Sequence, residues 1–245
     1  MMSLAGVLIC TNYNTVGRGN PAGESSPRKL RGKYAPATCF FLAPYVRSEY
    51  SKGMRIIAGS KRGMTLLSPK TQGSRPITDR VKESLFSVLY KYDVPRGATV
   101  ADLFCGVGSL GLEALSRGAK FVTFVERDPK IIATLNKNIE KAGFVSESKV
   151  VRADAFTAGA PAGSGGEPYG LVFVDPPYAA TKNIGSGSTL SGLLDILGDQ
   201  TTADGVAVVR TSQDVPLLDR YGPFRIEERW QWGTMAVTIM MKDDT

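Results

Sequence analysis

The chain has 245 residues, of which 42% are hydrophobic and 22% are charged, and its formal net charge is +7. This composition is typical of a soluble globular protein with a sizeable core, and no apolar run is long enough for a transmembrane helix. The absence of histidine excludes Ser-His-Asp and Cys-His nucleophilic sites as usually built, together with HExxH and Cys2His2 metal sites. Any chemistry must use carboxylates, backbone groups and a cofactor, and we expect no metal.

Residues 1–53 are set apart from the rest by composition. They are rich in Gly, Pro, Ser and Asn and show no periodicity, which predicts a disordered extension. Two interpretations stay open: a basic organellar transit peptide, or a start codon upstream of a protein that begins at Met54. Three scattered cysteines make no disulfide framework, so we expect the cytoplasm, or an organellar stroma or matrix if the extension is a transit peptide.

Positive charge is concentrated in the N-terminal third. Residues 1–53 hold seven Lys/Arg and two Glu, and residues 54–82 hold seven Lys/Arg and one Asp, while the remainder is mildly acidic. A basic segment next to a mildly acidic domain favours a phosphate-rich partner such as a nucleic acid over a merely solvated basic face.

Residues 54–96 are expected to form a hairpin and a helix. The segment from Met54 to Pro69 has two apolar runs around a Gly/Lys/Arg turn, which predicts a β-hairpin. In ITDRVKESLFSVL, Thr78 or Asp79 can cap a helix whose apolar residues fall on one face.

Strands and helices alternate in residues 97–245, which we expect to form the main domain. The predicted strands are 98–104, 120–126, 149–154, 169–175 and 205–212, and the predicted helices are 109–118, 129–143 and 190–198. FRIEERWQ and WGTMAVTIMMK predict a closing antiparallel hairpin. Repeated βα units imply a Rossmann-like α/β fold with a parallel sheet covered on both faces.

A glycine loop joins the first of these strands to its helix. Gly106, Gly108 and Gly111 in VADLFCGVGSLGLEAL have GxGxxG spacing, and Glu126 ends the next strand, where it could hold both hydroxyls of a ribose. This pattern fits NAD as well as S-adenosylmethionine. Asp102, four residues before the first glycine, favours a cationic or amine-bearing ligand over a pyrophosphate.

Two further residues near this loop have alternative interpretations. Asp154, which we place at the end of the third strand, either accepts a hydrogen bond from an adenine amino group or caps a helix at Ala155. Cys105 is interpreted as a small buried residue and not as a nucleophile.

The stretch VFVDPPYAA carries the most specific signal. Ligands in open α/β sheets bind at the carboxyl ends of strands, so Asp175 is expected to face the same crevice as the glycine loop. Pro176 and Pro177 have fixed φ and no N–H, so they make a rigid turn whose carbonyl oxygens are expected to be free acceptors. The Asp175 carboxylate and the Pro176 carbonyl suit a planar amino group, and Tyr178 can stack on a base, a contact worth roughly 1–3 kcal/mol.

These motifs together resemble a known family. DLFCGVGSLGLEALSRGA, VERDP, FVDPPY and the upstream RIIAGSKRG and SRPITDRVKESLF are similar to the bacterial 16S rRNA guanine-N2 methyltransferases of the RsmD type, over residues 54 to about 241. DPPY alone occurs in many amino methyltransferases, whereas its pairing with RPITDRVKESLF is much more specific. The resemblance implies a seven-stranded class I methyltransferase fold, S-adenosylmethionine as cofactor, and a guanine 2-amino group of small-subunit rRNA as target.

The resemblance also implies roles for single residues. The expected cofactor-binding residues are Asp102, Phe104, Gly106, Gly108, Glu126, Arg127, Asp154 and Ala155. The expected catalytic residues, which hold the target base, are Asp175, Pro176, Pro177 and Tyr178. Arg55, Lys61, Arg62, Arg75 and Arg80 are expected to bind RNA, with Thr78 and Asp79 near the mouth of the site. We expect a monomer whose partner is 16S rRNA, the small ribosomal subunit or an assembly intermediate.

Two departures and several alternatives qualify this assignment. Residues 1–53 have no counterpart in the family, and Arg210 stands where we expect an acidic residue in many relatives. A C5-pyrimidine methyltransferase needs a cysteine beyond the fourth strand, and none follows Cys105. DNA adenine-N6 or cytosine-N4 methyltransferases usually carry a recognition domain for which the chain has no room. An NAD oxidoreductase leaves DPPY unexplained, and a non-catalytic rRNA-binding assembly factor remains a further alternative.

Overall fold

The computed structural model describes residues 53–68, 77–162, 166–182 and 184–243, all within the compact unit Tyr50–Thr245. The predicted extension 1–53 lies outside these residues except for Gly53, as do Pro69 and Arg75. No helix among the described residues is long and apolar enough to cross a membrane.

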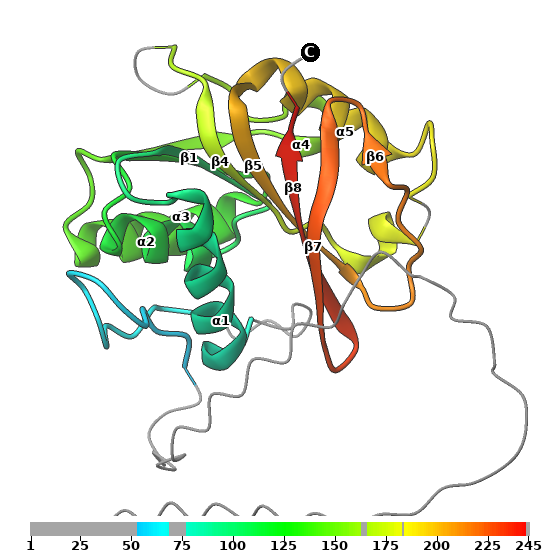
Figure 1. Cartoon of the computed structure of the whole chain (residues 1–245). Coiled ribbons are helices and arrows are strands. Elements are labelled where there is room, and N and C mark those ends of the chain that lie inside the picture. Colours follow the sequence, from blue (N-terminus) through cyan, green and yellow to red (C-terminus); the bar gives the residue numbers. More distant parts are fainter. Residues whose placement is uncertain (1–52, 69–76, 163–165, 183, 244–245) are drawn as a thin grey trace, which may run out of the picture. The chain divides into compact units, whose positions relative to one another are not determined.

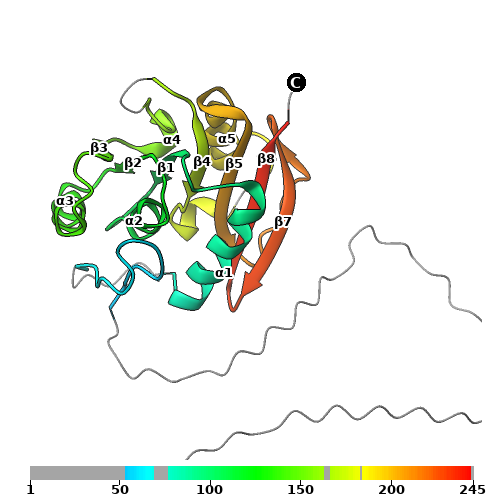
Figure 2. The same cartoon turned by 60° about the vertical axis from the view of Figure 1, so that its left-hand side comes forward.

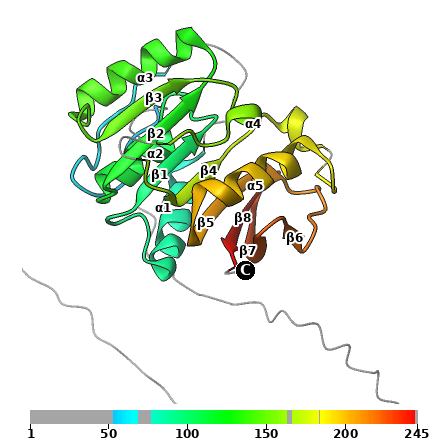
Figure 3. The ribbon, with the colours of Figure 1, turned by 90° about the horizontal axis from the view of Figure 1, so that it is seen from above.

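The core of the unit is one eight-stranded sheet in the order β3-β2-β1-β4-β5-β8-β7-β6, which can be followed across Figure 3. The first five strands in this order are parallel, and β8 joins them antiparallel to β5. The strands are β1 Thr99–Leu103, β2 Phe121–Glu126, β3 Ser148–Arg152, β4 Tyr169–Val174, β5 Thr201–Ser212, β6 Arg220–Tyr221, β7 Phe224–Trp232 and β8 Met235–Lys242. The Rossmann-like fold is thus confirmed, with the two-residue β6 added to the seven expected strands.

Helices cover both faces of this sheet, as Figure 2 shows. One face packs against α1, α2 and α3, and the other against α4 and α5. The helices are α1 Asp79–Leu89, α2 Ser109–Ser116, α3 Pro129–Ala142, α4 Ala155–Ala158 and α5 Thr189–Gln200, with the 3-10 turns η1 Tyr90–Tyr92 and η2 Tyr178–Thr181. Because β1, β4 and β5 are covered on both sides, buried residues follow one another without alternation, as in residues 171–174 of β4 and 206–209 of β5.

Most predicted boundaries are confirmed within one or two residues, because the sequence carries the expected end signals. Thr78 caps α1 through its side chain, Pro129 opens α3, and Gly143 ends α3 in the left-handed conformation. The strand predicted to start at residue 205 begins earlier, at Thr201, through an irregular register with β4. The short elements η1, η2 and β6 were not predicted, and α4 was predicted only as one of the two alternatives for Asp154.

The hairpin predicted from Met54 is much reduced. Its two arms share one antiparallel bridge between Arg55 and Thr65, supported by backbone hydrogen bonds such as Ile56 N–H to the Met64 carbonyl at 2.9 Å. The arms do not extend into strands of the main sheet. Instead the segment 54–68, cyan in Figure 1, lies beside α2 and is held there by polar contacts. The division into domains at residues 53 and 96 stays a prediction, although α1 shares its core with the central strands.

Candidate active site

The loops that follow the parallel strands meet at the carboxyl edge of the sheet. In register, Leu103 of β1 lies beside Val125 of β2 and Val174 of β4, and Val174 lies beside Val209 of β5. The glycine loop and the DPPY turn therefore follow neighbouring strand ends, Glu126 is the last residue of β2, and Arg210 lies in β5, two residues before its end. The β7–β8 turn reaches the same edge, because Met235 pairs with Ser212.

The glycine loop between β1 and α2 adopts the left-handed backbone that its sequence favours. Gly106 and Gly108 have φ of 56° and 86°, and Gly108 is the N-cap of α2. Phe104 also has a positive φ, 57°, although it has a side chain. Left-handed non-glycine residues are uncommon and concentrate at functional sites, so this outlier marks the loop as a candidate binding region.

Asp102, in β1, is hydrogen-bonded to the start of the helix that follows this loop. Its side chain is buried, and its Oδ2 accepts a hydrogen bond from the Gly111 amide at 2.8 Å, in the first turn of α2. This contact fixes the start of α2 relative to β1. Direct contact of Asp102 with a ligand stays a prediction.

Glu126 binds three backbone amides at the end of β2. Its Oε2 accepts from Gly106 at 3.1 Å, and its Oε1 accepts from Arg127 at 2.8 Å and Asp128 at 2.9 Å. The carboxylate therefore joins the glycine loop to the start of α3. It lies at the same edge of the sheet and is half-buried.

The structure favours the capping interpretation of Asp154. The strand β3 ends at Arg152 and not at Asp154, which instead caps the short helix α4 by accepting from the Phe156 amide at 3.0 Å. The exposed Arg127 reaches Asp154 in a loose ion pair of 3.9 Å. The centroids of the Phe156 and Phe104 rings lie 4.7 Å apart. The two rings form an aromatic wall next to the helix that Asp154 caps, and this pairing was not predicted from the sequence. Ala155 is buried under this wall.

The DPPY turn differs in one respect from the expectation. Pro176 is buried and Pro177 is exposed, and η2 begins at Tyr178. The carbonyl of Pro177 accepts the Ala180 amide at 2.8 Å, so it is not the free acceptor that the sequence suggested, because a 3-10 turn starts there. Asp175 and the Pro176 carbonyl remain the two acceptors of the predicted amine site.

Arg210 is the residue of this site that sequence reasoning did not place. It follows Val209 in β5 as Asp175 follows Val174 in β4, and its Nε lies 2.5 Å from Asp175 Oδ1 in an ion pair. Its guanidinium carbon lies 5.9 Å from the centroid of the Tyr178 ring. The signal was present, since both charged residues directly follow apolar runs, but their adjacency requires the order of the strands.

Burial raises the pKa of two carboxyl groups at this edge, Asp102 and Asp175. Burial, reinforced by the charges of Asp175 and Glu126 and opposed by the Gly111 amide, raises the pKa of Asp102 to about 7. Burial also raises the pKa of Asp175 to about 6, against the opposing effect of Arg210. Burial raises the pKa of the Cys105 thiol as well, which agrees with a buried structural residue and not with a nucleophile. Within the described ranges, no group of three acidic or cysteine side chains could hold a metal ion.

The predicted RNA-binding residues lie on the N-terminal segment and the first turn of α1. Arg62 and Arg80 are exposed, whereas the Lys61 ammonium lies 5.6 Å from the centre of the Phe144 ring. Arg55 forms an ion pair of 2.6 Å with Asp79, which was not expected. The first turn of α1 lies close to the glycine loop, because Lys82 Nζ donates to Ser109 Oγ at 3.1 Å. Arg75 lies outside the described residues.

Comparisons with known proteins show the family to which the chain belongs. The family model described as Conserved hypothetical protein 95 matches residues 54–241. The chain is 35% identical over 192 residues to the putative rRNA methyltransferase YlbH of Bacillus subtilis, covering 77% of this chain and 99% of that protein. It is 43% identical over 127 residues to the ribosomal RNA small subunit methyltransferase D of Escherichia coli, covering 51% and 60%.

A solved structure gives the same result. The putative methyltransferase yhhF from Escherichia coli superposes with a TM-score of 0.66 at 31% identity, covering 79% of this chain and 99% of that one. Residues 54–241, which the family model matches, contain the glycine loop, the DPPY turn and the basic residues of segment 54–82, which together make up the candidate site. The chain therefore belongs to the Conserved hypothetical protein 95 family and is of the RsmD rRNA methyltransferase type.

Proposed function

We propose that this protein is an S-adenosylmethionine-dependent methyltransferase that modifies the 2-amino group of a guanine in 16S rRNA. The observation that carries the proposal is the position of the DPPY turn, whose acidic side chain opens on the same sheet edge as the glycine loop. A basic segment lies next to that loop. Amine acceptor, cofactor loop and phosphate-binding surface are thus adjacent.

The residues at this edge fit the proposed cofactor. S-adenosylmethionine carries a sulfonium and an ammonium group, and it supplies an electrophilic methyl group when bound. Asp102 and Glu126 place negative charge beside the glycine loop, which suits a cation. A Cβ built on Gly106 would meet no atom within 4 Å, so the loop leaves space there for a ligand. Glu126 would hold the ribose. The Phe104–Phe156 pair would hold the adenine together with Oδ2 of Asp154, because Oδ1 is the oxygen that caps α4.

The remaining side chains would orient the target base. Asp175 and the Pro176 carbonyl accept the two hydrogens of an amino group, and this directs the nitrogen lone pair toward the cofactor side of the crevice. Tyr178 stacks on the base. The nitrogen loses one proton when the new N–C bond forms, and the Asp175 carboxylate is placed to accept it.

The experiment that tests the proposal uses the full chain, tritiated S-adenosylmethionine, and small ribosomal subunits from an Escherichia coli strain that lacks its methyltransferase D. The labelled RNA is digested and the modified nucleoside is identified. Label in N2-methylguanosine at one site is the expected result. Label on an adenine or cytosine amine would refute the guanine target, and no label on RNA despite cofactor binding would refute the rRNA substrate.

Substituting Gly106 should weaken cofactor binding selectively. In Gly106→Ala the new methyl group would enter the space assigned to the cofactor, and the positive φ adds a backbone cost of roughly 1–2 kcal/mol. Gly97→Ala is the matched control, because Gly97 also has positive φ and open space but precedes β1 at the opposite edge. Calorimetric titration should show a Kd increase only for Gly106→Ala. Equal affinities in the two variants would refute this position for the cofactor.

Methyl transfer should decline as the pH falls through about 6. Asp175 has its pKa raised to about 6, so below that pH its carboxyl is protonated and loses acceptor capacity toward the amine. Single-turnover rates between pH 5 and 8 measure the effect, with cofactor binding determined at each pH as the control. A rate that is flat down to pH 5 would contradict the role given to Asp175.

Reversing two charges of the N-terminal segment should weaken RNA binding and flatten its salt dependence. The double variant Lys61→Glu, Arg62→Glu should lower the slope of log K against log salt by roughly 0.7–0.9 for each phosphate that the protein no longer neutralises. The control Arg220→Glu, Arg225→Glu changes the net charge equally at the opposite end of the sheet. Filter-binding titrations at several salt concentrations give the slopes, and an unchanged slope would place the RNA surface elsewhere.

A further inference from the structure

The ion pair between Asp175 and Arg210 places a hydrogen-bond donor directly beside the acceptor of the target amine. Both residues follow paired positions of β4 and β5, and Nε of Arg210 lies 2.5 Å from Asp175 Oδ1. The Arg210 side chain is only 13% exposed, so its charge belongs to the wall of the site and not to the open surface. Its guanidinium also lies against the Tyr178 ring proposed to stack on the base.

This order of acceptor and donor can be compared with the edges of the bases. The Watson–Crick edge of guanine offers two adjacent donors, N2–H and N1–H, followed by the acceptor O6. A carboxylate has two oxygens with about four acceptor positions, so Asp175 can bind both donors while it remains paired with Arg210. A guanidinium has only donors and no acceptor, and at this place it complements O6.

The other amino-bearing bases fit less well. Adenine presents one donor, N6–H, and one acceptor, N1, and then only a C–H group. Cytosine presents one donor followed by two acceptors. On either of these bases, the Asp175 carboxylate would meet only one donor. A second acceptor position of Asp175 would then have no partner in a partly buried site, which costs binding free energy.

We propose that Arg210 is a specificity-determining residue that binds O6 of the target guanine. The inference rests on the proposed function and adds to it the group that selects guanine among bases with an exocyclic amine. Arg210 is 35 residues away from Asp175 in the sequence, and the two lie side by side because β4 and β5 are neighbours in the sheet.

The test separates O6 from the 2-amino group. Small subunits are reassembled from rRNA in which the target guanosine is replaced by 2-aminopurine riboside, which keeps the 2-amino group but lacks O6 and, with it, the N1 proton. The wild-type protein should lose about a hundredfold in kcat/KM on this substrate, because the contacts to O6 and to N1–H are both missing. In Arg210→Met this loss should be about tenfold smaller, because only the contact between N1–H and Asp175 then distinguishes guanine from 2-aminopurine.

Two further variants make the result interpretable. Arg210→Lys keeps a cationic donor and should recover part of the preference for guanine. Arg225→Met removes an arginine whose ion pair with Asp243 lies at the opposite end of the sheet, and it should discriminate like the wild type. Cofactor affinity and thermal unfolding are measured for each variant.

Distinct outcomes would overturn the inference. If Arg210→Met slows both substrates but still prefers guanine as strongly as the wild type does, Arg210 only positions Asp175. If the wild type does not distinguish the two substrates, O6 is not recognised at all. Failure of the wild type to methylate unmodified subunits would instead refute the proposed function, and this result is seen before any variant is made.

Discussion

Replacing Asp175 by alanine is expected to lower the rate of methyl transfer by about 10²- to 10⁴-fold, the range typical of removing a group that takes part in proton transfer. The variant removes the carboxylate acceptor of the amine site, while the Pro176 carbonyl and the glycine loop remain. Cofactor affinity should therefore change little. Single-turnover rates with small subunits and calorimetric titration of the cofactor measure the two effects separately.

Two other variants give this prediction a matched comparison. Asp175→Asn keeps the size of the side chain and one acceptor oxygen but cannot take a proton, so its rate should lie between those of the wild type and the alanine variant. Glu126→Ala should show the opposite pattern, with weak cofactor binding, because Glu126 joins the glycine loop to the start of α3. Near-normal transfer in Asp175→Ala would show that the DPPY turn does not hold the target amine.

The alanine variant also leaves Arg210 without its carboxylate partner, although the Arg210 side chain is only 13% exposed. An uncompensated charge of this kind destabilises a protein. Thermal unfolding of Asp175→Ala must therefore be compared with that of Asp175→Ala, Arg210→Met, in which both charges are absent. If the double variant recovers stability but not activity, the kinetic loss belongs to the missing acceptor and not to misfolding.

The sequence predicted local features well and interactions between distant segments poorly. The glycine at the end of α3, the cap of α1 and the apolar central strands depend on neighbouring residues, and all are confirmed. The pairing of Asp175 with Arg210 depends on the order of strands that are joined by a helix and a turn. Periodicity contains no information about that order, so Arg210 stands out in the sequence only as a departure from the family pattern.

The hairpin predicted at residue 54 is shorter than its apolar runs suggested, for a related reason. Its arms pair around the Arg55–Thr65 bridge, but Ile57 and Ala58 donate their amides to Glu113 of α2, at 2.7 and 3.0 Å, and not to the opposite arm. Glu113 interrupts an otherwise apolar helix sequence, SLGLEALS. A single acidic residue in such a helix normally indicates an exposed position, and nothing in the local sequence shows that this one is buried against another segment.

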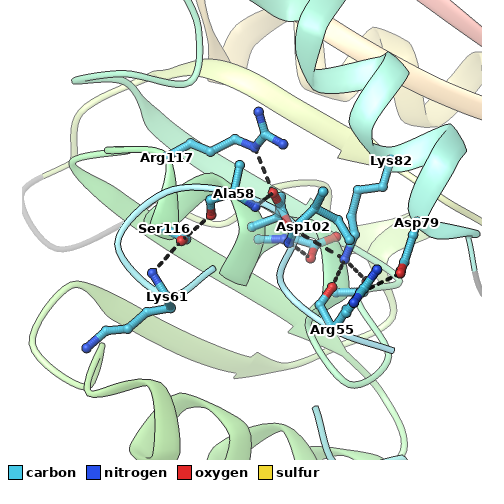
Figure 4. A network of polar contacts seen from close by, with 12 residues as sticks. Arg55, Ala58, Lys61, Asp79, Lys82, Asp102, Ser116 and Arg117 are labelled. Carbon is cyan, nitrogen blue, oxygen red and sulfur yellow. Dashed lines mark hydrogen bonds and ion pairs between the residues drawn. The ribbon is translucent and has the colours of Figure 1, made fainter. Parts of the chain in front are cut away.

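Glu113 is the centre of the network that holds the segment 54–68. Figure 4 shows this region, with the partners Ala58, Lys82 and Arg117 labelled. The Glu113 side chain has no exposed surface, and its oxygens accept from the two amides of the segment and from Arg117 Nε at 2.7 Å. Lys82 Nζ lies 3.6 Å away, and it donates to the Arg55 carbonyl at 2.7 Å. The carboxylate is thus surrounded by donors. Burial lowers the pKa of Lys82, and the charge of Glu113 opposes that effect.

Ser116 completes the attachment one turn further along α2. Its hydroxyl accepts from the Lys61 amide at 2.9 Å and donates to the Ala58 carbonyl at 2.6 Å. The turn that carries Lys61 and Arg62 is therefore fixed to α2 through its backbone. The positions of the proposed phosphate-binding side chains depend on this attachment, so the network couples the stability of the fold to RNA binding.

Substituting Glu113 by glutamine should cost about 3–5 kcal/mol of unfolding free energy, the loss typical when one partner of a buried ion pair is removed. The NH2 of the new glutamine would face one of the N–H groups that now donate to Glu113. Lys82 and Arg117 would also lose their buried counter-ion. Urea unfolding at neutral pH measures the change. The control is Glu167→Gln, which breaks the exposed ion pair with Lys120 and should leave the unfolding midpoint unchanged, because exposed pairs contribute little.

The same variant should also separate RNA binding from cofactor binding. In Glu113→Gln, the segment 54–68 loses hydrogen bonds to α2, so limited proteolysis should cut it faster, and RNA affinity should fall. The proposed cofactor residues follow β1, β2 and β3, and their carboxylates are held by backbone amides other than those that Glu113 binds, so cofactor affinity of the folded protein should persist. A variant as stable as the wild type, with the segment equally protected, would show that the network neither stabilises the fold nor positions the RNA-binding turn.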